Sequence, residues 1–273
     1  MERIKQAIEK AKKQGTAGVS SDAAPVVDQE AKSQALNGQI EVNYLYTDVV
    51  NLDPAHLEKN RIVAFNKNHH ANWAFDVLRT KVLQKMDEHG WRTLAITSPT
   101  LESGKTVVAI NLATSIAHQT QRTAMLVDFD LRRPMVANYL GLKRQLSFND
   151  VLSGKAEVPQ ALVNPGLPRL VVLPTARSVP KSSEVLSSSR VAGIIEELRN
   201  RYQDRIVIFD LPPVLAADDV LAVLPRIDCV LMVVGSGMSN QKEVEEAMRH
   251  VGSANLLGVV LNKDEAPARK GYY

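Results

Sequence analysis

The stretch LAITSPTLESGKTVVAINLA, residues 94–113, decides the fold of this chain. It consists of an apolar strand, a loop of small residues ending in Ser103-Gly104-Lys105-Thr106, and a run with apolar residues at helical spacing. This order places backbone N–H groups and the positive end of a helix around a phosphate group. We therefore predict that the loop binds the phosphates of a nucleotide, with Lys105 on the β- and γ-phosphates and Thr106 on Mg²⁺.

The loop departs from the usual phosphate-binding pattern at its first position. The pattern G-x-x-x-x-G-K-[ST] requires glycine at position 99, where this chain has Pro99. A bare Gly-Lys-Thr also occurs in ordinary strand-to-helix turns, so the prediction depends on the strand before it, the helix after it and the acidic residues downstream. The residues that we expect to contact the nucleotide here are Ser103, Gly104, Lys105, Thr106 and Val107.

Three acidic residues end two further apolar runs. AMLVDFD, residues 124–130, ends in Asp128 and Asp130, and IVIFD, residues 206–210, ends in Asp210. Ligands of open parallel sheets bind outside the carboxyl ends of the strands, so we expect these carboxylates to meet at the loop. Because Mg²⁺ usually takes one or two protein carboxylates, a third acid is free to orient or deprotonate a nucleophile. The alternative for any one of them is a strand-end acid that caps the next helix.

The order of apolar runs predicts the fold class. Strands are expected at 93–98, 123–130, 169–174, 206–211, 229–235 and 255–262, and helices at 70–86, 105–119, 188–202 and 240–251. Strands that alternate with helices predict an α/β domain in which an open parallel sheet has helices on both faces, and the phosphate-binding loop at 98–106 makes it P-loop NTPase-like. The predicted divisions are a partly disordered N-terminal tail and linker over 1–60, the P-loop domain over 61–265 and a C-terminal tail over 266–273.

Composition excludes several classes of protein. No apolar run approaches the roughly 18 residues that span a bilayer, and the N-terminus has no hydrophobic signal region, so we expect a cytoplasmic protein. Residues 1–15 carry five basic and two acidic side chains and are expected to form a short basic amphipathic helix. The rest of the chain is neutral in sum, which argues against nucleic acid as the partner. The six histidines show no ligand spacing with the single cysteine, Cys229, which we expect to be buried.

Asn262 ends the last predicted strand, in the sequence NKDE. A guanine-reading N-K-x-D would require aspartate at position 265, where this chain has Glu265, so a guanine nucleotide is disfavoured. Asn262 is a candidate to hydrogen-bond adenine. A loop asparagine that only closes the strand is an equal alternative.

Taken together, these residues resemble a bacterial tyrosine kinase of the capsule and exopolysaccharide export type. SPTLESGKT (98–106) is similar to that family's Walker A motif, LVDFDLRRP (126–134) to its Walker A′ motif and IVIFDLPP (206–213) to its Walker B motif. The phrases VLRTKVLQKM and SSEVLSSSR and the C-terminal RKGYY are also similar. The combination is specific to the family, whereas each motif alone is not.

The resemblance implies a deviant P-loop fold and transfer of the γ-phosphoryl group of ATP to tyrosine. It implies that Lys105 and the loop backbone hold phosphates, and that Thr106, Asp130 and Asp210 serve Mg²⁺. Asp128 would orient or activate the incoming phenol. The role of the arginine that completes the Walker A′ motif, Arg132, stays open between a structural contact and a contact to a neighbouring chain.

The resemblance also implies acceptors and partners. Tyr272 and Tyr273 would be autophosphorylated. The roughly ten residues between Asn262 and Tyr272 reach at most about 35 Å, so donation into a neighbouring chain is the easier geometry. The implied partners are other copies of the chain, a cognate phosphatase and a membrane-bound polysaccharide co-polymerase whose cytoplasmic tail activates the kinase and recruits it to the inner membrane.

The chain departs from this family at one motif, and two other interpretations stay open. Aligning the family's ring-assembly motif Glu-x-x-Arg-x-x-Arg on Arg79 puts Trp73 and Asp76 at its first two positions, so the usual ring is not expected. An ATPase switch of the chromosome-partitioning and division-site type shares the fold, but carries a signature lysine where this chain has Thr100. A nucleotide-binding scaffold of a polysaccharide export complex is the second alternative, favoured by the altered motif and the short tyrosine cluster.

Overall fold

The computed structural model describes residues 35–36, 39–40, 47–119, 121–143 and 146–264. The chain divides into two units, Met1–Lys32 and Ser33–Tyr273, and every described residue belongs to the second. The predicted N-terminal helix, most of the predicted linker and the tail that carries Tyr272 and Tyr273 lie outside the described residues. None of the helices in this described part combines the length and the apolarity that a membrane crossing requires.

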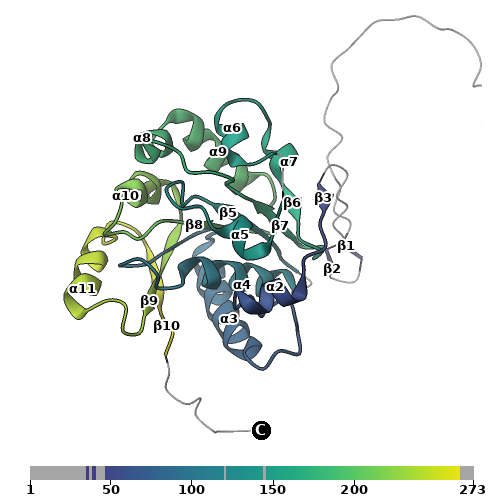
Figure 1. Ribbon diagram of the computed structural model, residues 1–273, viewed down its shortest axis with the longest axis horizontal. Coiled ribbons are helices and arrows are strands. Elements are labelled where there is room, and N and C mark those ends of the chain that lie inside the picture. Colours follow the sequence, from purple (N-terminus) through teal and green to yellow (C-terminus); the bar gives the residue numbers. More distant parts are fainter. Residues whose placement is uncertain (1–34, 37–38, 41–46, 120, 144–145, 265–273) are drawn as a thin grey trace, which may run out of the picture. The chain divides into compact units, whose positions relative to one another are not determined.

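Eight strands form one mostly parallel sheet in the order β10-β9-β4-β8-β5-β7-β6-β3 (Figure 1). They are β3 (Asp48–Val49), β4 (Thr93–Thr97), β5 (Thr123–Asp128), β6 (Val163–Asn164), β7 (Leu170–Leu173), β8 (Arg205–Asp210), β9 (Cys229–Gly235) and β10 (Leu256–Asn262). A separate antiparallel pair joins β1 (Ala35–Leu36) to β2 (Gln39–Ile40). The predicted α/β fold and its six strands are confirmed.

One edge of the sheet adds an antiparallel pair to the predicted parallel strands. β6 pairs antiparallel with β7, and β3 then adds to β6 in parallel. Both added strands have two residues, which is too short for a period-two pattern to be visible in the sequence.

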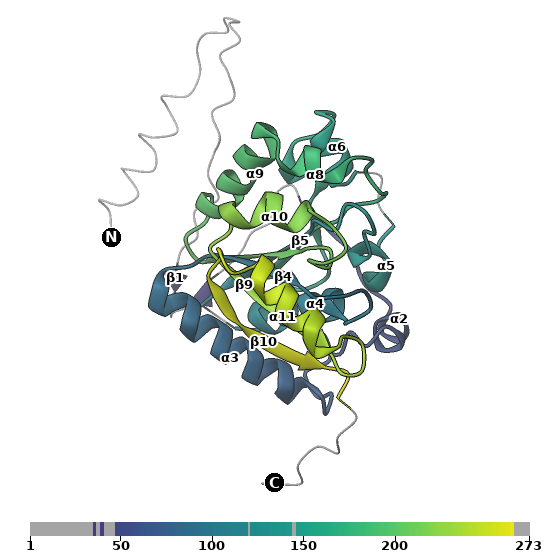
Figure 2. The same ribbon diagram turned by 90° about the vertical axis from the view of Figure 1, so that its left-hand side faces the viewer.

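Helices cover both faces of the sheet (Figure 2). On one face lie α2 (Pro54–Lys59), α3 (Asn72–His89), α4 (Lys105–Ala117) and α5 (Val136–Leu140). On the other lie α6 (Phe148–Leu152), α7 (Val158–Ala161), α8 (Ser182–Leu186), α9 (Ser189–Asn200), α10 (Asp219–Val223), the 3₁₀ turn η1 (Leu224–Arg226) and α11 (Gln241–His250). Alternate residues of β8 supply the two cores: Ile206 and Ile208 face α4, whereas Val207 and Phe209 face α9.

The first turns of α3 leave two large apolar residues exposed. Trp73 and Val77 are 58% and 45% exposed, and the buried apolar residues of the helix are Val82, Leu83 and Met86. The reason is that α3 meets α4 there through polar groups. The Ser115 hydroxyl donates to Asp76 Oδ1 at 2.9 Å, and Arg79 donates to the Ser115 hydroxyl at 3.1 Å, so the contact does not need apolar side chains.

Asn111 fastens the segment before α3 to α4. Its side chain is fully buried, and its Oδ1 accepts hydrogen bonds from the backbone N–H groups of Val63 and Ala64 at 2.8 and 2.9 Å. Its Nδ2 donates to the carbonyl of Arg61 at 3.0 Å. One side chain thereby satisfies three backbone groups of a segment without regular structure and anchors it beside the helix that carries Lys105.

Candidate active site

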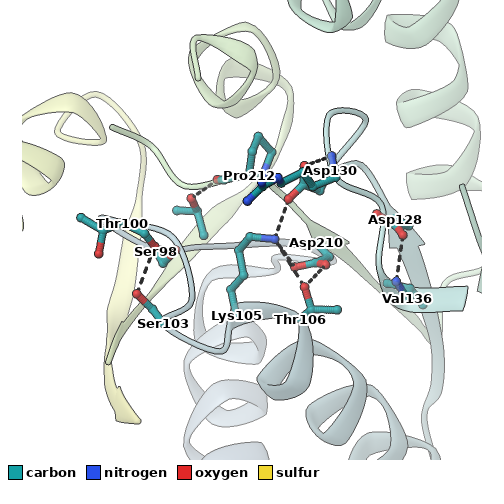
Figure 3. Close-up of polar contacts among 12 residues, drawn as sticks. Ser98, Thr100, Ser103, Lys105, Thr106, Asp128, Asp130, Val136, Asp210 and Pro212 are labelled. Carbon is teal, nitrogen blue, oxygen red and sulfur yellow. Dashed lines mark hydrogen bonds and ion pairs between the residues drawn. The ribbon is translucent and has the colours of Figure 1, made fainter. Parts of the chain in front are cut away.

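A hydrogen bond within the loop between β4 and α4 holds it in shape, and the last residue of β4 is bonded to the segment that follows β8. The Ser103 hydroxyl donates to the carbonyl of Thr100 at 3.1 Å, and the Thr97 hydroxyl donates to the carbonyl of Pro212 at 2.6 Å (Figure 3). Ser103 and Thr97 are both buried. The loop therefore presents its backbone, rather than these hydroxyls, to a ligand.

Gly104 and Asn262 fit closely together at the start of α4. Gly104 has φ 87°, and a Cβ there would collide with the side chain of Asn262. Asn262 Nδ2 donates to the carbonyl of Ser103 at 2.9 Å. The left-handed backbone therefore favours glycine at this position, and a larger residue would also displace the side chain of Asn262. Asn262 braces the loop, and its contact to adenine stays a prediction.

The first turn of α4 supplies free donors at the loop. The first N–H groups of an α-helix have no partner within the helix, and in α4 these include the N–H groups of Lys105, Thr106 and Val107. The side chain of Val107 packs against the core, so this residue offers a ligand only its backbone. The arrangement is the one that the sequence predicted for a phosphate site, a helix N-terminus behind a tight loop.

Lys105, Thr106, Asp130 and Asp210 come together in front of that helix (Figure 3). Lys105 Nζ lies 2.8 Å from Asp130 Oδ2 and 3.6 Å from Asp210 Oδ1. The Thr106 hydroxyl donates to Asp210 Oδ2 at 2.7 Å, and the backbone N–H of Arg133 donates to Asp130 Oδ1 at 2.9 Å. The four side chains meet because β4, β8 and β5 are adjacent in the sheet and parallel, so their carboxyl ends share one edge.

Asp128 lies beside this group and points away from Lys105 toward the start of α5 (Figure 3). It is paired in register with Asp210 across β5 and β8, and it is fully buried. Its Oδ2 accepts a hydrogen bond from the backbone N–H of Val136 at 3.0 Å, while its Oδ1 has no hydrogen-bond partner among the described residues. An unpartnered carboxylate oxygen in a buried position is costly unless a ligand or a proton engages it.

Burial controls the ionisation of the site. Burial acts to lower the pKa of the Lys105 ammonium, but the charges of Asp210 and Asp130 outweigh it, so this pKa lies above its usual value. Burial raises the pKa of Asp210 against the opposing charge of Lys105. The pKa of Asp128 is raised well above its usual value by burial and then by the charge of Asp210. Closely spaced acids with shifted pKa values are characteristic of functional sites.

The residues present fit a magnesium–nucleotide complex. Thr106 and Asp210 offer a hydroxyl and a carboxylate in contact, and Asp210 Oδ1 has no hydrogen bond within the described residues. Across those same ranges, no group of three or more His, Cys, Asp or Glu side chains is arranged to hold a metal ion. Mg²⁺ at nucleotide sites is bound through one or two carboxylates together with phosphates and water, which the donors here can satisfy.

Arg132 makes contacts that the sequence did not indicate. Its Nε donates to Asp219 Oδ1 at 2.8 Å and its Nη2 donates to Asp218 Oδ1 at 2.9 Å. This result favours the structural role that had been left open for Arg132. The sequence signal was present, because two adjacent acids follow the Walker B strand, but nothing in the spacing identified their partner.

Arg79, at the altered ring motif, is also engaged within the chain. Its Nη1 is paired with Asp76 and donates to the carbonyl of Ser115 at 3.3 Å. Asp76, at the middle position of the motif, is therefore the ion-pair partner of Arg79, the motif's remaining arginine.

Comparison with known proteins places this geometry in a family. A family model described as the CobQ/CobB/MinD/ParA nucleotide binding domain matches residues 94–271. The chain is 32% identical over 198 residues to the putative tyrosine-protein kinase EpsB of Ralstonia nicotianae, which covers 71% of this chain and 26% of that protein. It is 26% identical over 201 residues to the putative tyrosine-protein kinase CapB of Staphylococcus aureus, covering 73% of this chain and 87% of CapB.

A solved structure agrees with these relatives. The kinase domain of the Escherichia coli tyrosine kinase Etk superposes with a TM-score of 0.70 at 28% identity, covering 82% of this chain and 91% of that domain. The fold and the phosphate loop thus define a nucleotide-binding P-loop protein. The chain belongs to the CobQ/CobB/MinD/ParA nucleotide-binding family, and the relatives and the solved structure that it resembles are bacterial tyrosine kinases, the resemblance that the motifs predicted. It spans 26% of the length of EpsB.

Proposed function

We propose that this chain is an ATP-dependent protein tyrosine kinase that phosphorylates its own C-terminal tyrosines and regulates capsule or exopolysaccharide polymerisation and export. One observation carries the proposal: a phosphate loop with Lys105, Thr106 and two metal-competent acids lies beside a further acid, Asp128, that is fully buried and has an unpartnered oxygen. A nucleotide-binding scaffold has no need of that additional acid.

Each residue has a separate task in this proposal. The backbone N–H groups of 103–107 and the ammonium of Lys105 hold the phosphates of ATP, and Asn262 braces the loop against its neighbouring strand. Thr106, Asp210 and Asp130 hold Mg²⁺, which supplies charge neutralisation on the phosphates when it is bound. Lys105 keeps its positive charge in this site because the pKa of its ammonium is raised by Asp210 and Asp130.

Asp128 is assigned the phenol. In the transfer, the tyrosine oxygen forms a bond to the γ-phosphorus, the bond between that phosphorus and the β,γ-bridging oxygen breaks, and ADP leaves. The phenolic proton passes to Asp128, whose Oδ1 is the acceptor because Oδ2 is held by the N–H of Val136. The raised pKa of Asp128, caused by burial and by Asp210, makes its carboxylate a stronger base than an exposed one.

Acceptors and partners complete the proposal. Tyr272 and Tyr273 accept the phosphoryl group from a neighbouring chain, because a short tail reaches a neighbour's site more easily than it folds back onto its own. The resemblance of this chain to bacterial tyrosine kinases supports a membrane-protein activator that recruits the kinase to the inner membrane. It also supports a phosphatase that dephosphorylates the tail.

The experiment is an anti-phosphotyrosine blot of purified protein after incubation with Mg-ATP, alone and with candidate activator tails fused to its N-terminus. Lys105→Met and the double variant Tyr272→Phe/Tyr273→Phe should abolish the signal, whereas Lys59→Met, which changes an exposed lysine at the end of α2, should not. Binding of Mg-ATP without phosphotyrosine under every activator would favour the scaffold. A signal that survives in Lys105→Met would overturn the assignment of the phosphate loop.

A further inference from the structure

Arg132 bridges two loops at the edge of the nucleotide site. It lies in the A′ loop (residues 129–135), which follows β5. Its guanidinium contacts the start of α10, the helix that follows β8. The two hydrogen bonds to Asp219 and Asp218 use two different nitrogens of the guanidinium, at 2.8 and 2.9 Å. The side chain of Asp219 is fully buried, and that of Asp218 is 68% exposed. The contact is thus anchored at a buried acid and is not a surface ion pair alone.

The segment that holds these two acids is itself fastened to the phosphate loop. The β8–α10 loop (residues 211–218) runs past the beginning of the phosphate loop, where the backbone N–H of Val214 donates to the carbonyl of Ser98 at 2.9 Å. The N–H of Leu215 donates to the carbonyl of Pro99 at 3.3 Å. The β8–α10 loop therefore connects the phosphate loop at one end with the A′ loop, through Arg132, at the other.

A second contact holds the A′ loop directly. Asp130 belongs to this loop, and its carboxylate is paired with Lys105 Nζ at 2.8 Å. The A′ loop is also held by its backbone, since the N–H of Phe129 donates to the carbonyl of Asp210 at 2.9 Å and the N–H of Val179 donates to the carbonyl of Leu131 at 2.8 Å. Its charged side chains add two attachments: the pair Lys105–Asp130 and the clamp formed by Arg132 with Asp218 and Asp219. Nucleotide phosphates compete for only one of them, because the lysine of a phosphate loop turns to the β- and γ-phosphates when nucleotide binds.

We propose that Arg132 is a positioning residue that keeps the A′ loop in place when a bound nucleotide draws Lys105 away from Asp130. The clamp contains no group that contacts phosphate, so it persists while Lys105 changes partner. It thereby keeps Asp128, at the end of β5, and Asp130, two residues later, in position while nucleotide is bound. This inference rests on the proposed nucleotide site, but it does not require that the acceptor be tyrosine.

The chemistry of the clamp explains why arginine is required. A guanidinium presents several N–H donors in a fixed fork and can engage two carboxylates at once, whereas a lysine has a single nitrogen. Arg132→Ala would leave Asp219 buried without its cation, which strongly destabilises a protein, so loss of folding would obscure the result. Arg132→Lys keeps the charge and removes the fork. Arg122→Lys is the matched control. Arg122 precedes β5, at the end of that strand away from the A′ loop, and pairs with Asp87.

The test is hydrogen–deuterium exchange of the A′ loop in full-length protein, with and without saturating ADP, in EDTA so that no Mg²⁺ holds Asp130. Without nucleotide, Arg132→Lys should exchange within about twofold of the wild type, because Lys105–Asp130 still holds the loop. With ADP its A′ loop should exchange at least roughly tenfold faster than that of the wild type, since local opening follows the free energy of the remaining contacts. Arg122→Lys should match the wild type in both states.

Two results would overturn the proposal. Equal protection of the A′ loop in Arg132→Lys and wild type with ADP would show that the clamp does not position it. Faster exchange of the A′ loop in Arg132→Lys already without nucleotide would show that the clamp is needed at all times, and not only after Lys105 has left Asp130. Titration calorimetry of ADP in EDTA with the wild type separates these results from failure of the proposed nucleotide site, and none of the readouts depends on phosphotyrosine.

Discussion

Thr106 and Asp210 join the first turn of α4 to the end of β8. The Thr106 hydroxyl donates a hydrogen bond to Asp210 Oδ2 at 2.7 Å, and both side chains are buried. This hydrogen bond therefore ties the start of α4 to the carboxyl end of β8. A magnesium ion held by this pair would find its protein ligands already oriented, which favours binding because little ordering remains to be done.

Changes at this pair should weaken nucleotide binding only when magnesium is present. We expect Thr106→Ala and Asp210→Asn to raise the Kd of Mg-ADP by at least roughly tenfold, since loss of a metal-orienting group costs about 10- to 100-fold in metal affinity. Titration calorimetry with and without Mg²⁺ measures the effect. Thr114→Ala, which removes a buried hydroxyl bonded to Ile110 on the same helix, is the control. An unchanged Kd in Thr106→Ala would contradict the metal assignment.

The activity should depend on pH through Asp128. A base must be ionised to accept a proton, and burial together with Asp210 raises the pKa of this carboxyl well above its usual value. The rate should therefore fall as the pH is lowered through that raised pKa, in a range where an exposed aspartate is still ionised. Asp128 and Asp210 interact, so the profile of kcat/KM reports the pair. A profile that stays flat down to the range of an ordinary aspartate would be evidence against a basic role for Asp128.

The burial that raises the pKa of Asp128 should also make its ionised carboxylate destabilise the folded state. A carboxyl whose pKa is higher in the folded state stabilises the fold below its unfolded pKa, and this contribution is lost as the pH rises through the folded pKa. At pH 8 we expect Asp128→Asn to raise the Tm by a few degrees, since about 1 kcal/mol corresponds to roughly 2–4 °C at this size. The difference should shrink toward low pH.

Asp150 provides a control of opposite sign. The hydroxyl and N–H of Ser147 donate to its carboxylate, and this hydrogen bonding lowers the pKa of Asp150. Its contribution is therefore present above the unfolded pKa and is lost as the pH falls through the folded pKa. Asp150→Asn should lower the Tm at pH 8. Scanning calorimetry measures the change in Tm of both variants. Equal changes in Tm would mean that burial does not set the pKa of Asp128.

Removal of Asn111 should destabilise the domain. Asn111→Ala leaves two backbone N–H groups and one carbonyl of residues 61–64 without their buried partner. We expect a loss of roughly 2–4 kcal/mol in the free energy of unfolding, because each unsatisfied buried group costs about 1–3 kcal/mol and part is recovered by relaxation. Urea denaturation measures it, with the exposed Asn68→Ala as control. A loss below about 0.5 kcal/mol, as for a surface substitution, would contradict this role.

The central strands and the phosphate loop were predictable because they are dominated by local pattern. β4 and β8 are continuous buried runs bounded by turns, and the loop that follows β4 has a sequence dictated by backbone geometry at Gly104. The convergence of Lys105 and Asp210 then followed from one topological rule about strand ends.

The features that were not predictable depend on contacts between distant segments. Nothing near Arg132 in the sequence identifies Asp219, which lies 87 residues away. Nor does the pattern of α3 reveal that its first turns meet α4 through Asp76 and Ser115, which leaves Trp73 exposed. Helical periodicity reports which face is apolar, whereas the partner of that face is a tertiary property.

The measurement that tests the account most directly is the intact mass of wild type and Asp128→Asn after incubation with Mg-ATP and an activating tail, with Mg-ADP affinity measured on both. The account predicts that the wild type gains phosphoryl groups on the peptide that carries Tyr272 and Tyr273. Asp128→Asn should gain none at comparable times while binding Mg-ADP within about threefold of the wild type, because its phosphate loop is intact. Tail phosphorylation in Asp128→Asn at the wild-type rate would contradict the account.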